Sequence, residues 1–170
     1  MERFILEEHL NNWNLSPEDL MEKYGMFEHY TISYAASITT SDEDGNSNSI
    51  LFGGTECHAS FHYLFNFSRT KPDSICLRPL TPRELWPEAC PNWLEEFQKV
   101  NVEFNRKLIE SLFGDKYEKC THKLYDGYGY VWQFPEYSIS TYDIYDAHGH
   151  PNGGDIYISF KKKEPKTWER

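Results

Sequence analysis

Two histidines and two aspartates near the carboxyl end are the first residues whose types could carry chemistry. Segment 146–150 reads Asp-Ala-His-Gly-His, and Asp155 follows five residues later. Imidazole together with carboxylate is a ligand set that suits zinc or another divalent transition metal. A metal-dependent enzyme using His148, His150 and Asp155 is therefore one hypothesis. The alternative, which we favour, is a hairpin loop whose Asp, Asn, Pro and Gly residues supply turn geometry.

A second pair of imidazoles, His58 and His62, is spaced by four residues. The aromatic alternation around them predicts a strand, in which residues i and i+4 share a face but lie about 13 Å apart. One metal ion cannot bridge that distance. We therefore interpret both histidines as ordinary sheet residues, with a pH-sensitive contact as the alternative.

Other catalytic signatures are missing from the sequence. It contains no G-x-S-x-G nucleophile motif, no G-x-x-x-x-G-K-[ST] phosphate loop and no G-x-G-x-x-G. The four cysteines form no C-x-x-C pair, and we expect them to be reduced thiols: Cys57, Cys76, Cys90 and Cys120. These observations predict a protein that is not an enzyme and that needs no cofactor.

Negative charge is concentrated in the first third of the chain. Residues 1–60 contain eleven acidic and two basic residues, a balance of -9, whereas residues 61–170 contain sixteen acidic and fifteen basic residues, a balance of -1. Such a surface is unsuited to nucleic acid, because phosphate binding needs basic residues. It suits a basic protein partner, whose encounter rate the field would raise. Simple solubility is the alternative explanation.

The acidic residues include a run in segment 41–48, which we interpret as a polar hairpin loop. The run lacks the sixth-position Gly and twelfth-position Glu of an EF-hand, so we do not predict a calcium site. We predict that Asp42, Glu43 and Asp44 contact the partner, with Tyr30 or Tyr34 nearby as an aromatic anchor.

The elements that must position these residues follow from periodicity and turn residues. Helical spacing predicts helices over 2–13 and 16–24, the second with a capping box from Ser16 to Asp19 and a stop at Gly25. A third helix spans 92–113. Alternation predicts strands over 28–40, 50–54, 56–68 and 74–78, and an antiparallel meander of four strands over 117–163.

These elements predict an α+β protein built from two helix-plus-antiparallel-sheet units in tandem, with the sheets covered on one face by helices. The units are residues 1–78 and 92–170, joined by a proline-rich connection over 79–91. One compact domain with a continuous sheet is also compatible with the pattern.

The element order resembles that of β-lactamase inhibitor proteins and of small outer-membrane assembly lipoproteins, in which a helical pair packs on a short antiparallel sheet. The acidic, Tyr- and Trp-rich chain also resembles the immunity proteins that bacteria make against polymorphic or contact-dependent toxins, chiefly through the hairpin of segments 137–145 and 154–159. This resemblance implies an inhibitor that neutralises a basic toxin or nuclease-like enzyme. A structural or adaptor subunit is a further alternative.

The amino-terminal residues and the hydropathy predict a cytoplasmic protein without membrane contact. No apolar stretch approaches the roughly 20 residues that a spanning helix requires. The first eight residues carry neither a basic region nor a small-residue cleavage site. The sequence does not predict an oligomeric state.

Overall fold

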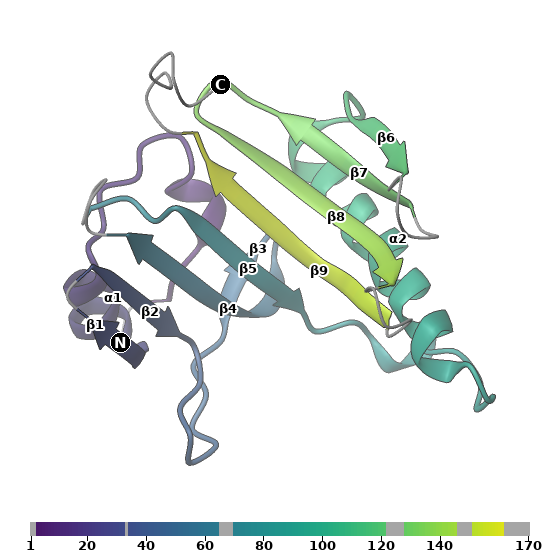
Figure 1. The fold of residues 1–170 in the computed structure, drawn as a ribbon, viewed down its shortest axis with the longest axis horizontal. Coiled ribbons are helices and arrows are strands. Elements are labelled where there is room, and N and C mark those ends of the chain that lie inside the picture. The colour runs from purple at the N-terminus through teal and green to yellow at the C-terminus, as the bar shows by residue number, and fades with distance from the viewer. Residues whose placement is uncertain (1–2, 33, 65–69, 122–127, 146–150, 162–170) are drawn as a thin grey trace.

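The strands of the protein form one antiparallel sheet. The computed structural model describes residues 3–32, 34–64, 70–121, 128–145 and 151–161. Nine strands lie within those residues, and eight of them follow the order β1-β2-β4-β5-β9-β8-β7-β6 (Figure 1). The ninth, β3, pairs with β4 on the same edge of β4 as β2. With two α-helices on this sheet, the predicted α+β class is confirmed.

The strands are short to medium in length, and each is bounded by a turn or a connection. Their bounds are β1 Phe27–Ile32, β2 Ala35–Thr39, β3 Ile50–Phe52, β4 Thr55–Leu64, β5 Ser74–Pro79, β6 Glu118–Thr121, β7 Tyr128–Gln133, β8 Tyr137–Tyr145 and β9 Pro151–Phe160. The helices are α1 Pro17–Tyr24 and α2 Trp93–Phe113, with short 3-10 turns η1 Leu6–Glu8 and η2 Arg83–Leu85.

Helix α1 begins and ends where the sequence predicts. The Ser16 hydroxyl accepts a hydrogen bond from the Asp19 amide at 3.2 Å, and the Asp19 carboxylate accepts one from the Ser16 amide at 2.9 Å. Gly25 closes the helix in the left-handed region with φ of 68°. The reciprocal cap satisfies two amides that a helix start otherwise leaves unpaired.

The predicted helix over 2–13 is wrong. Only the 3-10 turn η1 forms there, and the amide of Leu51 donates to the Phe4 carbonyl at 2.9 Å, so the chain runs beside β3. Phe4, Leu6 and Leu10 are all buried. A short isolated helix is marginal in water, so burial of these side chains against the sheet decides the conformation.

The single strand predicted over 28–40 is instead a hairpin. The chain reverses between Ile32 and Ala35, which pair with each other, and this gives β1 and β2. No glycine, proline, asparagine or aspartate marks the reversal in the sequence. Ser33 is the only turn-favouring residue between Ile32 and Ala35 in the sequence, so the turn signal was weak.

The strands of the two halves join into one sheet through one strand pair. β5 from the first half pairs with β9 from the second, with Ile75 opposite Ile158 and Leu77 opposite Ile156. The predicted four-stranded meander is confirmed as β6 to β9. β9 pairs with β8 on one side and with β5 on the other. The sheet is therefore continuous across both halves.

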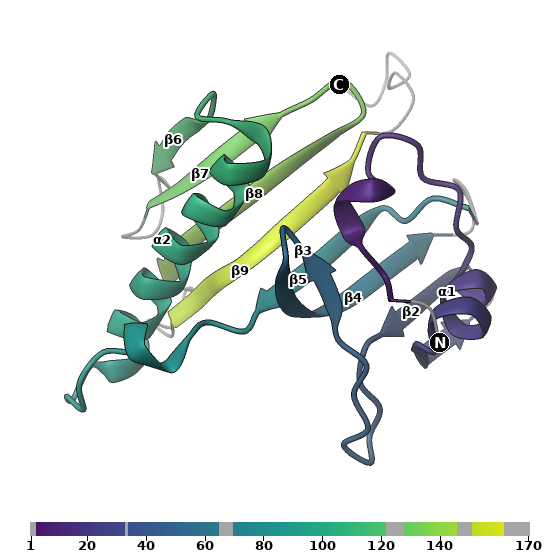
Figure 2. The ribbon, with the colours of Figure 1, turned by 180° about the vertical axis from the view of Figure 1, so that it is seen from behind.

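The sheet has one buried face and one open face. Side chains that point to the buried face include Phe61, Tyr63, Leu77 and Ile158, each with no exposed surface. α2 lies across β8 and β9 on one side of the sheet, in front in Figure 2 and behind in Figure 1. The opposite side faces the viewer in Figure 1, and we call it the open face.

The open face is defined by cross-strand register, because residues directly opposite each other in a sheet point to the same side. Ser37 on β2 pairs with His62 on β4, and His62 pairs with Ser74 on β5. A second row runs from Ser60 through Cys76 to Tyr157. These rows bring residues from both halves onto one surface.

Candidate functional site

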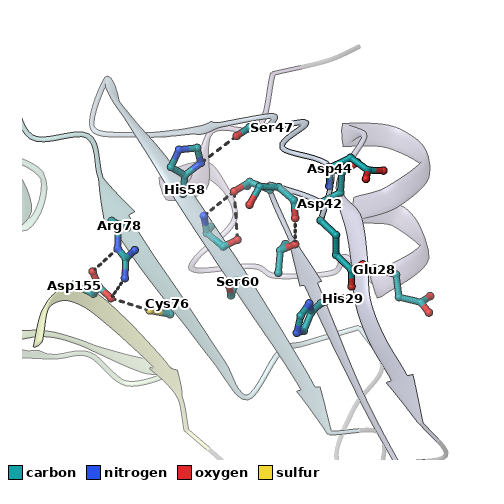
Figure 3. Close-up of a pocket in the computed structure, with 15 residues that line it drawn as sticks. Glu28, His29, Asp42, Asp44, Ser47, His58, Ser60, Cys76, Arg78 and Asp155 are labelled. Carbon is teal, nitrogen blue, oxygen red and sulfur yellow. Dashed lines mark hydrogen bonds and ion pairs between the residues drawn. The ribbon is translucent and has the colours of Figure 1, made fainter. Parts of the chain in front are cut away.

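A groove of about 860 Å³ lies on the open face, between the acidic loop 40–48 and the middle of the sheet (Figure 3). β1, β2, β4, β5 and β9 all contribute to it. Its charged and imidazole-bearing lining residues are Glu28, His29, Asp42, Glu43, Asp44, His58, Arg78 and Asp155. Five of these eight are carboxylates, so the groove is predominantly acidic.

The floor of the groove is fixed by an ion pair between β5 and β9. Arg78 donates from Nε to Asp155 Oδ1 at 3.2 Å and from Nη2 to Asp155 Oδ2 at 3.4 Å (Figure 3). The Asp155 side chain is 14% exposed and the Arg78 side chain 74% exposed. The hydrogen bonds that Arg78 donates to Asp155 raise the pKa of Arg78 above its usual value. Arg78 therefore neutralises the one carboxylate that lies deep in the floor.

Cys76 completes this cluster but is not an activated nucleophile. Its Sγ donates to Asp155 Oδ2 at 3.6 Å. Burial, followed by the negative charge of Asp155, raises the pKa of the Cys76 thiol from 9.0 to about 12. Nucleophilic cysteines require the thiolate, which an electropositive environment favours and this environment disfavours.

Two imidazoles lie on β4 along the open face. The Oγ atom of Ser47 lies 3.2 Å from Nδ1 of His58, which ties the acidic loop to β4. Burial and the nearby His29 lower the pKa of His62 below 6.5. His58 and His62 both lie in β4, four residues apart and on the same face, so the strand prediction for these two histidines is confirmed.

Asp42 shapes the acidic loop, because its carboxylate accepts hydrogen bonds from within the turn. Its Oδ1 accepts from the amides of Asp44 at 3.0 Å and Asn46 at 2.8 Å, and its Oδ2 accepts from the Asn46 side-chain amide at 2.8 Å. Within this turn Gly45 adopts φ of 85°, where a β-carbon would be strained. Glu43 and Asp44 are exposed, and neither forms an ion pair with any residue that the structure describes.

The loop geometry gives a pH prediction. The hydrogen bond from the Asn46 side chain lowers the pKa of Asp42 below 3.8, so the loop contacts are present above that value and are lost only as pH falls through the lowered pKa. We expect the amide proton shifts of Asp44 and Asn46 to titrate together below pH 3.8 in NMR spectra. Asp42→Ala should abolish this step, and a step that survives the substitution would contradict the assignment.

The two predicted tyrosines lie at the edge of the sheet and are not part of the groove lining. Tyr30 on β1 is 42% exposed and Tyr34, in the turn before β2, is 55% exposed. Ile32, which the sequence prediction missed, is 44% exposed between them. Its exposure could not be foreseen, because an isoleucine in an alternating strand is normally taken as core. Exposed rings and aliphatic side chains of this kind are typical anchors of protein interfaces.

The predicted metal ligands are not brought together within the described structure. His148 and His150 lie outside the described residues, and Asp155 is already bonded to Arg78 and Cys76. Among the described residues, no group of three or more His, Cys, Asp or Glu side chains could hold a metal ion. Arg78 and Cys76, which accompany Asp155, were not predicted, because only the β5–β9 pairing places them beside it.

Searches of protein-family models, curated proteins and solved structures found no match to this chain. Within the described residues, no helix has the length and apolar character needed to cross a membrane.

Proposed function

We propose that this protein is a non-catalytic binding module that holds a basic protein partner against the acidic groove and the β1 edge. The observation that carries the proposal is the juxtaposition of free carboxylates with exposed apolar side chains. Glu28 and Asp44 line the groove, and the exposed Tyr30 and Ile32 lie two and four residues after Glu28 on the same strand. Carboxylates would steer and orient a cationic surface, and the apolar residues would supply buried contact area.

The biological role that fits such a module is inhibition. A basic toxin or nuclease-like enzyme carries the positive charge that this surface complements. Binding without chemistry would suffice to block its active site, as the resemblance to bacterial immunity proteins implies. We also retain the prediction that residues 1–78 and 92–170 are tandem helix-plus-sheet units, each contributing strands to the partner-facing sheet.

A paired charge reversal tests the electrostatic part of the proposal. Glu43→Lys/Asp44→Lys is expected to weaken partner binding about 10- to 100-fold at low salt, because like charges would replace complementary ones. Asp42 is left intact so that the loop keeps its shape. The measurement is calorimetric titration with the co-purified partner, for which the product of the adjacent reading frame is the first choice.

The matched control is Glu84→Lys/Glu88→Lys. Both residues are exposed in the connection between β5 and α2, and the pair changes net charge by the same amount away from the groove. We expect its affinity to stay near wild type. Equal losses in both double variants, or an affinity indifferent to salt, would refute a specific acidic site.

A further inference from the structure

β1 is an edge strand with unusual exposure. It pairs with β2 on one side, and no described strand pairs with its other side. All five residues from Glu28 to Ile32 are exposed, so neither face of the strand is covered. Phe27–Ile32 contains no lysine or proline, the residues that commonly protect sheet edges, and its one irregularity is a bulge between Glu28 and Tyr30.

The other sheet edge is protected in the usual way. β6 has only four residues, Glu118–Thr121, and includes Lys119. The Lys119 ammonium lies 5.3 Å from the Tyr128 ring centroid and 5.9 Å from that of Tyr130. A strand of four residues with a lysine is poorly suited to pairing with another chain, whereas β1 has six residues and no lysine. The contrast singles out β1.

The backbone direction of β1 follows from its neighbours. The Thr40 amide donates to the Ala59 carbonyl at 3.1 Å, so Thr40 directs its backbone groups toward β4. Alternate residues of an antiparallel strand face opposite neighbours, and Ser37 and Ala35 therefore face β1. Their partners in β1 are Tyr30 and Ile32. Thr31, between those two, turns its N–H and C=O away from β2 into the unpaired edge.

The negative charge near β1 indicates which kind of chain could pair with this strand. Glu28 lies on β1 itself, and Figure 3 shows it near Asp42 and Asp44 at the same end of the groove. A second copy of the chain, with a net charge of -10, would bring like charges together there. A segment with lysine or arginine would instead be attracted.

We propose that β1 captures an extended basic segment of the partner, which adds to the sheet as a further strand. This inference rests on the proposed function and specifies its mode of recognition. Side chains of the added strand alternate between faces, so those on the open side would contact Tyr30 and Ile32 and should be apolar. Those on the other side would share the face of Thr31 and Glu28, whose partners in β2 are the buried Ala36 and Ile38, and should be basic. Glu28 lines the groove from the sheet edge. The expected motif is an alternation of apolar and basic residues over the length of β1.

The test uses capped peptides of about eight residues that alternate lysine with valine, added to isotope-labelled full-length protein. Two matched versions carry N-methyl groups, one on every lysine amide and one on every valine amide. Only one set of amides can face β1 at a time. We expect one methylated peptide to bind like the unmodified one and the other to lose about tenfold or more in affinity. The bound state should shift the Thr31 amide resonance and slow its hydrogen exchange.

A protein variant gives the complementary test. Thr31→Pro removes the outward N–H, and proline is tolerated at edge positions whose N–H faces solvent. We expect it to lose peptide binding while its thermal unfolding stays cooperative. Because the methylated peptides are tested on the wild-type protein, the proposal is decided even if this variant fails to fold.

Each outcome separates this proposal from the proposed function. Equal binding of both methylated peptides, with shifts at Glu43 and Asp44 but none at Thr31, would overturn strand addition and leave electrostatic binding intact. Absence of peptide binding at millimolar concentration would also overturn strand addition, while the Glu43→Lys/Asp44→Lys titration decides the proposed function independently. A protein dimer that Thr31→Pro dissociates would assign the edge to a second copy instead.

Discussion

Replacing Trp132 with alanine is expected to lower the free energy of unfolding by about 3–5 kcal/mol. Trp132 lies on β7, is 1% exposed, and its ring centroid is 5.0 Å from that of Tyr117. Its Nε1 donates to the Gly114 carbonyl at 2.9 Å, just after α2 ends. The substitution removes a large buried ring and leaves that carbonyl without this donor, so a cavity and an unpaired polar group add to the cost.

Urea denaturation followed by circular dichroism measures this loss. Trp132→Phe keeps most of the apolar volume but loses the indole donor and part of the ring, so its cost should be clearly smaller than that of Trp132→Ala. Tyr34→Ala removes a ring that is 55% exposed and should change stability by less than about 1 kcal/mol. If Trp132→Ala were no more destabilising than Tyr34→Ala, the assignment of Trp132 to the core would be wrong.

Cys76 is expected to react with iodoacetamide about 1000-fold more slowly at pH 8 than a thiol of ordinary pKa. Burial and then the charge of Asp155 raise its pKa from 9.0 to about 12, and each unit reduces the thiolate fraction about tenfold. The measurement is the time course of alkylation at each cysteine peptide by mass spectrometry. Cys90, which is exposed, supplies the internal comparison.

A substitution of Asp155 separates the effect of burial on the Cys76 pKa from the effect of the neighbouring negative charge. Asp155→Asn removes the negative charge but not the burial, so Cys76 alkylation should accelerate only partly. Because burial is the larger cause, the rate should remain well below that of Cys90. Rapid alkylation of Cys76 in the wild-type protein would show an activated thiol and reopen the catalytic interpretation of the floor cluster.

Several local features were predictable because their causes lie within a few residues of sequence. The Ser16–Asp19 capping box and the Gly25 stop define α1 through contacts three to five residues apart. The meander over β6 to β9 follows from aromatic alternation interrupted by turn residues. The hairpin position of the acidic loop was also predicted, although the internal use of the Asp42 carboxylate was not.

The orientation of α2 shows where periodicity is insufficient. Its range was predicted to within one residue, yet the side chains it buries include Gln98 and Asn105, and Leu94 is 52% exposed. Asn105 Nδ2 donates to the Gly154 carbonyl at 2.9 Å and to Thr141 Oγ1 at 3.1 Å. A polar residue can therefore occupy the buried stripe when strands far along the chain supply its partners.

The sequence by itself determined the α+β class, the positions of α1 and α2, the carboxyl-terminal meander and the acidic character of the first 60 residues, because composition, periodicity and capping act locally. Only the tertiary structure decided that β5 pairs with β9, that Arg78 and Cys76 meet Asp155, and that Tyr30 and Ile32 line an unpaired edge. Contacts between residues nearly 80 positions apart depend on strand register. Register is set by how a whole sheet buries one face, which no local pattern specifies.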